Sequence, residues 1–250
     1  MSNKFIIIPA YNEARRISHV ISDIREAYGN QYKIVVVNDG SSDNTASIAE
    51  KLDVKVLKHS INRDQGAALV TGTKYALSKG ADYVLHFDAD GQHSVKSIGK
   101  LISPLEGGKV DVVLGSRFLN DFEKVEERLN GVFTWVWQTF LRVWNTKNIP
   151  TMRRVLIFGN IIVNTLLTGV LLSDAHNGLR SFSRKAAEIM RIRHDGKAHA
   201  TEYISEIHAN KLSYIEVPVD IFYNQAEKRS QNFFDGVSIL KDIIIKRIMH

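Results

Sequence analysis

The chain has 250 residues, 44% of them hydrophobic and 24% charged, an ordinary globular composition that excludes disordered, collagen-like and coiled-coil classes. It contains no cysteine, so disulfide scaffolds, thiolate metal sites and cysteine nucleophiles are excluded, and any metal must bind to oxygen or imidazole. Thirty-three lysines and arginines against 27 aspartates and glutamates give a net charge of +6, which suits nucleic acid, a phosphorylated substrate or an acidic membrane face.

The chain begins with a short apolar run that ends at Pro9. This run is too brief for the core of a signal peptide, and no small-residue cleavage site follows it. We therefore expect a cytoplasmic protein.

The first half alternates short β-branched runs with amphipathic helical stretches. The runs expected to form strands are Phe5–Ile8, Ile34–Val37, Val54–Leu57, Tyr83–Phe87 and Val110–Leu114. They are continuously apolar rather than alternating, which is typical of parallel strands that are buried on both faces. The pattern predicts an α/β protein with a parallel sheet and helices on both sides.

Each connecting helix has a start signal in the sequence. The expected capping residues are Asn12, Ser42 or Asp43, Asn62 and Ser94. The helix N-termini therefore follow the carboxyl ends of the strands, and this is the edge at which open α/β sheets bind ligands.

Two acidic, glycine-containing loops follow predicted strands. Asp88 and Asp90 are two residues apart after the fourth strand, so both carboxylates can reach one divalent ion, and Gln92 offers a further oxygen. Oxygen ligands favour Mg²⁺ or Mn²⁺. Asp39 follows the second strand, at the same edge of the sheet. A solvated turn or helix cap is the alternative for the acidic pair, and an Asx turn is the alternative for Asp39.

The segment from Arg128 to Ser173 carries five basic residues, no acidic residue and all three tryptophans of the chain. Its tryptophans are Trp135, Trp137 and Trp144. The run Val155–Leu172 is apolar enough to span a membrane, but a polar stripe recurs in it every four residues, at Asn160, Asn164 and Thr168. We expect helices that lie flat on a membrane surface, and two core helices are the alternative.

The remainder predicts a strand, two helices, a second strand and a terminal amphipathic helix. The first four are expected at Gly178–Phe182, Ser183–Met190, Thr201–Asn210 and Tyr214–Val219. No Pro/Gly/Ser-rich hinge interrupts the chain, so one domain over residues 1–250 is expected.

Five motifs occur in an order that resembles the family-2 inverting glycosyltransferases of the GT-A nucleotide-diphosphosugar fold. They read PAYNE, VVVNDGSSDNT, NRDQGAAL, HFDADGQH and LGSRF. The second half is similar to the polyprenyl-phosphate, or dolichyl-phosphate mannosyltransferase-like, branch of that family. Its matching segments are SDAHNGLRSFSR, HATEYISEI and EVPVDIFY. Ser94 stands where the metal motif commonly continues with proline, and EKRSQN replaces a basic loop richer in glycine.

The resemblance implies a GT-A (Rossmann-like) α/β fold, with a mostly parallel central sheet and helices on both faces. Residues 1–120 then form the nucleotide-sugar-binding half. Residues 121–173 form amphipathic interfacial helices, and residues 174–250 form the acceptor half and closing helix.

The resemblance also implies a role for individual residues on the donor side. The nucleoside would be surrounded by Pro9, Tyr11, Glu13 and Asp39. Asp88 would lie near the ribose and the metal, while Asp90 and Gln92 would face the ion that bridges the diphosphate. Such an ion neutralises the charge that develops on the departing nucleoside diphosphate.

Basic residues are expected at the phosphates. Arg117 would be a second cation at the diphosphate, with a surface ion pair as the alternative, and Arg180 would hold the acceptor phosphate. Lys228 and Arg229 would close over the diphosphate as a loop.

A general base is needed only for some acceptors. A polyprenyl phosphate is already anionic at neutral pH, whereas a sugar hydroxyl needs a carboxylate, for which Glu202 and Asp174 are the candidates. Capping or pairing within the helix is the alternative for Glu202 and His199.

The expected function is transfer of a sugar from a nucleotide-diphosphate sugar to a dolichyl or undecaprenyl phosphate, with the protein peripheral on the inner, cytoplasmic face of an anionic membrane. The alternative is a soluble transferase that acts on a glycan hydroxyl in cell-envelope polysaccharide synthesis. A nucleic-acid partner is not expected, because a basic binding module gives no reason for carboxylates clustered at strand ends. A membrane-anchoring subunit and a homo-oligomer are left open.

Overall fold

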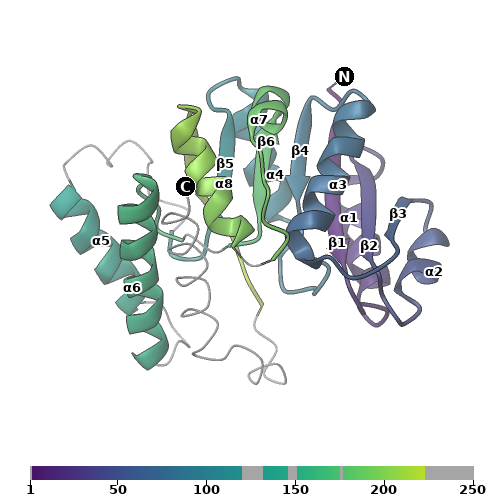
Figure 1. The fold of residues 1–250 in the computed structure, drawn as a ribbon, viewed down its shortest axis with the longest axis horizontal. Helices are drawn as coiled ribbons and strands as arrows, with labels where there is room; N and C mark the ends of the chain where they lie inside the picture. Colours follow the sequence, from purple (N-terminus) through teal and green to yellow (C-terminus); the bar gives the residue numbers. More distant parts are fainter. Residues whose placement is uncertain (1, 120–131, 146–150, 175–176, 197, 223–250) are drawn as a thin grey trace.

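Seven strands form one sheet in the computed structural model, which describes residues 2–119, 132–145, 151–174, 177–196 and 198–222 (Figure 1). The strands are β1 (Lys4–Ala10), β2 (Lys33–Asp39), β3 (Lys55–His59), β4 (Tyr83–His86), β5 (Val112–Ser116), β6 (Arg180–Ser183) and β7 (Tyr214–Pro218). Their order across the sheet is β3-β2-β1-β4-β6-β5-β7, and every pairing is parallel except those of β6, which runs antiparallel to β4 and β5. The predicted mostly parallel sheet is confirmed.

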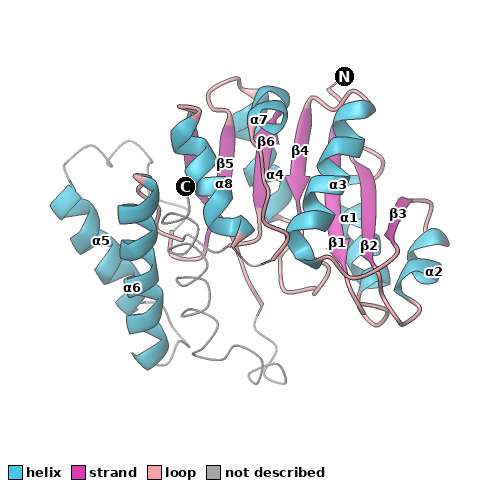
Figure 2. Ribbon diagram, viewed as in Figure 1, coloured by secondary structure: helices cyan, strands magenta, loops and turns pink. Residues whose placement is uncertain are grey.

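Helices cover both faces of this sheet, as Figure 2 shows. The helices are α1 (Ile17–Tyr28), α2 (Thr45–Glu50), α3 (Asp64–Ser78), α4 (Ser97–Glu106), α5 (Val132–Asn145), α6 (Thr151–Thr168), α7 (Arg184–Ile189) and α8 (His199–Ala209). α1 and α4 pack on one face, while α3, α7 and α8 pack on the other.

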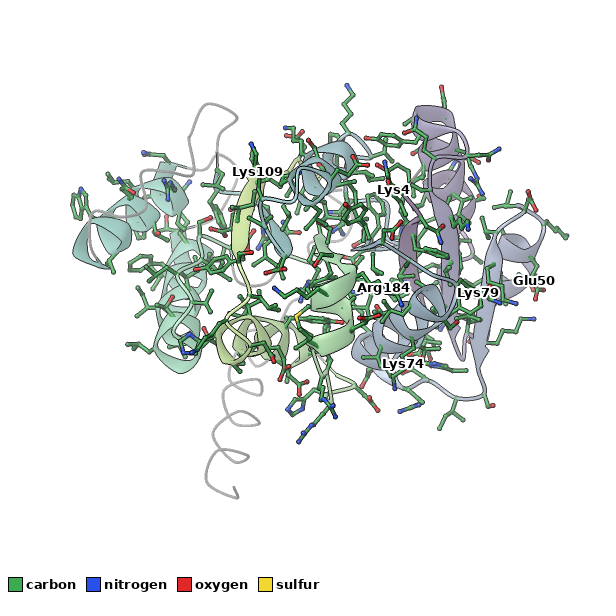
Figure 3. The ribbon with its side chains drawn as sticks, turned by 90° about the horizontal axis from the view of Figure 1, so that it is seen from above. Lys4, Glu50, Lys74, Lys79, Lys109 and Arg184 are labelled. Carbon is green, nitrogen blue, oxygen red and sulfur yellow. The ribbon has the colours of Figure 1, made fainter. Side chains whose placement is uncertain are left out.

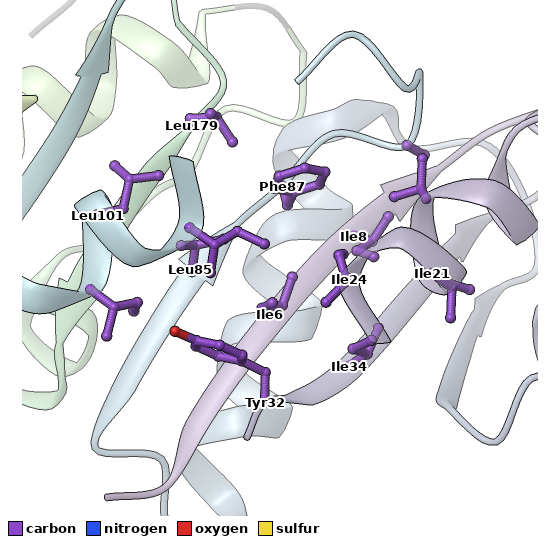
Figure 4. Close-up of a cluster of buried hydrophobic side chains, with 14 of the residues drawn as sticks. Ile6, Ile8, Ile21, Ile24, Tyr32, Ile34, Leu85, Phe87, Leu101 and Leu179 are labelled. Atoms are coloured by element: carbon purple, nitrogen blue, oxygen red, sulfur yellow. The ribbon is translucent and has the colours of Figure 1, made fainter. Parts of the chain in front are cut away.

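The alternation of side chains along β1 explains the two layers. Ile6 and Ile8 point into the cluster that contains Ile21 and Ile24 of α1, and Leu101 of α4 closes the same cluster (Figure 4). The intervening residues of β1 point to the opposite face, where α3 packs on them. β1 is therefore buried on both sides, which is why its sequence contains a continuous apolar run.

Two helix starts were predicted wrongly. α1 begins at Ile17 rather than directly after Asn12, and α4 begins at Ser97 rather than after Ser94. Asn12 has a φ of 55°, and its Oδ1 accepts hydrogen bonds from the backbone N–H (2.9 Å) and hydroxyl (3.2 Å) of Ser42. The Asn12 side chain thus joins two loops instead of capping the next helix.

α5 and α6 lie together at one end of the molecule (Figure 1). Val143 of α5 and Ile161 of α6 share a buried cluster with Phe118, so both helices have an inward face. Thr168, expected on an exposed polar stripe, is buried, and the side chains of Asn160 and Asn164 lie outside the described residues. The exposed fraction is nevertheless 55% for Trp137 and 79% for Leu166, so apolar surface remains on the outside. Within the described part of the chain, no helix is both long and apolar enough to cross a bilayer.

Candidate functional site

The loops after β1 and β2 are hydrogen-bonded to each other at the carboxyl edge of the sheet. The backbone N–H of Glu13 donates to the Thr45 hydroxyl (2.8 Å), and that of Ala14 donates to Asp43 (3.1 Å). Hydrogen bonds from Thr45 hold the pKa of Asp43 below its ordinary value, although burial acts to raise it. Pro9 is buried within β1, whereas the Tyr11 ring next to these loops is 47% exposed. The Tyr11 ring is therefore accessible to a flat ligand.

Asp39 lies at the end of β2 and is buried. His59 Nδ1 lies 2.6 Å from its carboxylate, and the backbone N–H of Arg63 donates to both oxygens at 3.0 and 3.1 Å. His59 is in turn held by the Thr71 hydroxyl, 2.9 Å from Nε2. Asp39 thus fixes the loop before α3, a contact that the Asx-turn alternative did not anticipate.

Asp88, two residues beyond the end of β4, is held by two side chains. Gln65 Nε2 donates to Oδ1 at 2.7 Å, and His93 Nε2 lies 3.0 Å from Oδ2. Burial raises the pKa of the Asp88 carboxyl, but the His93 hydrogen bond and the charge of Arg180 outweigh it, so that the pKa lies below its ordinary value. Asp88 is accordingly ionised and fixed in direction.

The segment before β6 approaches Asp88 closely through Gly178. A Cβ atom on Gly178 would collide with the carboxylate of Asp88, so any larger residue here would displace that carboxylate from its hydrogen bonds with Gln65 and His93. Sequence reasoning did not assign this role, although Gly178 falls within the quoted SDAHNGLRSFSR motif.

Asp90 and Gln92 form a tight turn beside Asp88. Asp90 Oδ1 accepts a hydrogen bond of 2.9 Å from the backbone N–H of Gln92. The part of the chain that the structure describes has no group of three or more histidines, aspartates and glutamates arranged to hold a metal. Asp88 and Asp90 nevertheless offer the hard oxygen donors that Mg²⁺ takes from proteins, usually one or two carboxylates completed by substrate phosphate and water. The donor chemistry therefore fits the expected ion.

Arg117 and Asp174, predicted in separate roles, are bound to each other across 57 residues of sequence. Arg117 donates from Nε (2.6 Å) and from a terminal nitrogen (2.8 Å), so the pair has the two-bond fork geometry. The Asp174 side chain is only 2% exposed. A carboxylate held in this way is poorly suited to accept a substrate proton, and Arg117 reaches a diphosphate only by sharing or leaving Asp174.

Glu216 of β7 holds the segment that contains Ser173 and Asp174 by hydrogen bonds. This residue was not identified from the sequence. Its carboxylate is fully buried and accepts from the backbone N–H groups of Ser173 (2.9 Å) and Asp174 (3.1 Å) and from the Ser173 hydroxyl (3.0 Å). Ser173 in turn contacts the hydroxyl of Ser116, next to Arg117 (2.7 Å). Two sequence signals pointed to it: it is a single acid inside an apolar strand, and it opens the quoted EVPVDIFY motif.

Arg180 of β6 is 3% exposed and lies against an aromatic ring. Its guanidinium carbon is 4.9 Å from the centre of the Tyr203 ring, and it donates to the backbone oxygen of Asn177 at 2.9 Å. Burial lowers the pKa of Arg180, with Tyr203 and Asp88 opposing that effect. Among the described residues, Nε of Arg180 and Nδ2 of Asn177 are buried donors that find no hydrogen-bond acceptor. Two donors next to Asp88 and Gly178 therefore remain unsatisfied.

Glu202, the other base candidate, holds a loop. Its Oε2 accepts from the backbone N–H groups of Arg193 (2.9 Å) and His194 (2.8 Å), while His199 Nδ1 lies 2.8 Å from the oxygen of Gly196. These contacts favour the local pairing alternative for both side chains. Lys228 and Arg229 lie outside the described residues.

Comparison with known proteins finds a family model and related proteins that match this chain. The model of glycosyl transferase family 2 matches residues 5–186. UDP-N-acetylglucosamine–dolichyl-phosphate N-acetylglucosaminyltransferase of Methanococcus voltae is 30% identical, over 98% of this chain and 96% of that protein. Polyprenol monophosphomannose synthase of Mycolicibacterium smegmatis is 27% identical, over 86% of this chain and 75% of that protein.

Solved structures share the fold. Glucosyl-3-phosphoglycerate synthase of Mycobacterium tuberculosis, in complex with Mn²⁺, UDP-glucose and phosphoglyceric acid, superposes with a TM-score of 0.63. The match covers 97% of this chain and 79% of that one at 16% identity. It confirms the predicted GT-A fold.

Proposed function

The chain belongs to glycosyltransferase family 2, and from that premise we propose that it transfers a sugar from a nucleoside diphosphate sugar to a polyprenyl phosphate, with inversion at the anomeric carbon. The names of the Methanococcus and Mycolicibacterium relatives support this acceptor class, since one acts on dolichyl phosphate and the other makes polyprenol monophosphomannose.

The observation that carries the proposal is the setting of Asp88. An ionised carboxylate, fixed by Gln65 and His93, lies at the carboxyl edge of the sheet beside Asp90 and directly under Gly178 of the acceptor half. The residues proposed for the donor and those proposed for the acceptor therefore lie next to each other. An inverting transfer needs that arrangement, because nucleophile and leaving group must lie on opposite sides of the same carbon.

Asp88 and Asp90 would hold Mg²⁺ or Mn²⁺ against the donor diphosphate. The ion supplies charge neutralisation for the leaving nucleoside diphosphate. The protein's own contribution is to orient both carboxylates: Gln65 and His93 hold Asp88, and the Gln92 backbone holds Asp90. The Mn²⁺ and Mg²⁺ complexes of the Mycobacterium synthase support this choice of ion.

On the acceptor side, Arg180 and Asn177 offer donors that suit a phosphate. Their unsatisfied nitrogens lie next to Gly178, and a guanidinium binds phosphate oxygens in charge-assisted hydrogen bonds. Since the carboxylates of Glu202 and Asp174 are both engaged in local hydrogen bonds, neither is well placed as a general base. A phosphate acceptor needs none, because its attacking oxygen is already anionic at neutral pH. This difference favours the lipid phosphate over a sugar hydroxyl.

The exposed side chains of α5 and α6 are of the kind that would bind to a membrane surface. Trp137 and Leu141 are exposed one turn apart on α5, and Leu166 is exposed on α6. The segment around them, Arg128 to Ser173, carries basic charge without acids. Apolar side chains and basic charge together give a surface that would rest on anionic lipid without crossing it.

The test is a panel of nucleotide sugars with Mn²⁺, supplied with a polyprenyl phosphate or with a soluble glycan acceptor. The expected result is a lipid-linked sugar product of inverted anomeric configuration, formed only in the polyprenyl phosphate arm. Product in the glycan arm alone would replace the proposal with a transferase acting on a hydroxyl.

A further inference from the structure

A cavity lies on the face of the sheet that α3, α7 and α8 cover. It has a volume of about 420 Å³ and opens between α3, α7, the loop after α7 and α8. Its wall is largely apolar and includes Leu77, Phe182 and Tyr203. This volume falls in the range of pockets that hold small organic ligands. None of the residues placed above at the donor diphosphate lines it.

The mouth of the cavity carries three basic side chains. Lys74, Arg191 and Arg193 line it, and within the described part of the chain none of these three side chains forms an ion pair. Glu188 is the one acid among its lining residues, and that acid is already paired with Arg184 at 2.7 Å. Lys74 and Arg184 can be located in Figure 3.

The two arginines are carried on a backbone that is held in place. The N–H of Arg191 donates to Glu206 at 3.0 Å, and the N–H of Arg193 donates to Glu202 at 2.9 Å. On the α3 side, the N–H of Gly66 donates to the oxygen of Asp195 at 2.7 Å, which fastens the far end of the same loop. The backbone that carries Arg191 and Arg193 is therefore held by the fold, while their side chains are exposed to solvent and to a ligand.

We propose that this cavity is a binding site for an amphiphilic anion, a molecule with a short apolar body and a phosphate or similar acidic head. The body lies against the half-buried side chains of Leu77, Met190 and Ile192, where apolar surface is removed from water. The head lies at Lys74, Arg191 and Arg193, which supply charge-assisted hydrogen bonds. Arg180, the proposed acceptor phosphate contact, does not line this cavity, although Tyr203 lies between the two sites and contacts Arg180. The proposal does not depend on the proposed reaction.

Titration calorimetry with octyl phosphate, inorganic phosphate and octanol tests the site. We expect octyl phosphate to bind one molecule per chain, and each partial probe to bind at least about tenfold more weakly, since each lacks one half of the interaction. The double variant Arg191→Glu, Arg193→Glu should weaken octyl phosphate binding by about tenfold or more. Ala187→Phe, which fills the cavity, should weaken it as well.

The matched control is Lys79→Glu, Lys109→Glu, which makes the same charge change at exposed positions that do not line the cavity; Lys109 lies well apart from Lys74 in Figure 3. It should leave octyl phosphate binding unchanged. Thermal unfolding verifies that each variant folds. Octyl phosphate binding that survives in the two cavity variants but is lost in Arg180→Ala would overturn the proposal, because the probe would then occupy the acceptor site. Transferase activity, measured separately on each variant, decides the proposed function independently.

Discussion

Asp90 is the side chain whose replacement should separate chemistry from folding. Its Oδ1 accepts the Gln92 N–H, and asparagine keeps that oxygen while removing the charge that would hold a divalent ion. We expect Asp90→Asn to abolish turnover and to leave the thermal transition nearly unchanged. Asp53→Asn, at an exposed position, is the control. Full activity of the wild type in excess chelator, after removal of bound metal, would contradict the mechanism.

Replacing Arg180 should weaken the binding of the acceptor more than the binding of the donor. Its buried guanidinium, with an unsatisfied Nε, would bind the acceptor phosphate, so Arg180→Ala is expected to raise the acceptor KM much more than the donor KM. Because alanine also removes the contact with the Tyr203 ring, Arg180→Lys serves as a second variant that keeps the charge. Equal changes in both KM values would place Arg180 in the donor site or the structural core.

Asp111 should make the free energy of unfolding depend on pH in the acidic range. Burial raises the pKa of its carboxyl, but hydrogen bonds from Ser213 and Lys185 outweigh burial and lower it from the ordinary value of 3.8. A lowered pKa means that the native state binds this proton less readily than the unfolded state. The stabilisation is therefore fully present above pH 3.8 and is lost as the pH falls through the native pKa.

We expect Asp111→Asn to lower the free energy of unfolding at pH 7 by about 1.5–3 kcal/mol, the range for hydrogen bonds to a charged group. The difference from the wild type should shrink as the pH is lowered below 4. Urea unfolding at a series of pH values measures it, with Asp53→Asn as the exposed control. A difference that stays constant across the series would show that the charge of Asp111 does not stabilise the fold.

At the scale of elements, α5 and α6 carry the membrane prediction. We expect the wild type to sediment with anionic vesicles at low salt and to be released at high salt, since charge attraction is screened beyond about 10 Å at 0.1 M ionic strength. The variant Trp137→Ser, Leu141→Ser, Leu166→Ser removes exposed apolar side chains from these helices and should bind weakly.

Ile61→Ser is the control for that experiment, because Ile61 is also strongly exposed but lies outside α5 and α6. If the wild type ignores anionic vesicles, or the triple variant binds them equally well, these two helices only complete the core. The acceptor would then have to be sought among soluble glycans.

Local sequence signals predicted most elements, because burial on both faces of a strand leaves a readable apolar run. Ile6 and Val36 lie in such runs, and both are fully buried in the sheet. The direction of β6 could not be read in this way, since the sequence RSFS is equally compatible with either pairing. Asn12 misled the prediction of α1 because a side chain that favours caps also favours bridges between loops.

In the candidate site as well, residues within one loop could be predicted from the sequence, whereas contacts between distant segments could not. Asp88 and Asp90 were predicted as ligands from their spacing within one loop, and that placement stays a prediction. The contact between Arg117 and Asp174 was beyond reach, because it joins the end of β5 to a segment 57 residues away. Glu216 was missed for a related reason: its partners include backbone N–H groups, which leave no trace in the sequence, and a hydroxyl 43 residues away.

For the whole molecule, Glu216 ties β7 to the segment before β6. We expect Glu216→Gln to lower the free energy of unfolding by about 2–3 kcal/mol, because its amide nitrogen would face the N–H groups that the carboxylate now accepts from. Chemical denaturation measures the loss, with the exposed Glu26→Gln as control. Equal stability of Glu216→Gln and the wild type would show that the segment is held by other contacts.

The place of β6 between β4 and β5 also bears on the order in which a ribosome delivers the chain. β5 is complete at Ser116, yet its two neighbours in the sheet, Arg180–Ser183 and Tyr214–Pro218, are translated much later. Until then the outer edge of β4 and both edges of β5 lack partners, and unpaired edges invite contacts with other chains. A nascent chain of this protein therefore carries unpaired strand edges from the time Ser116 is added until Pro218 is added.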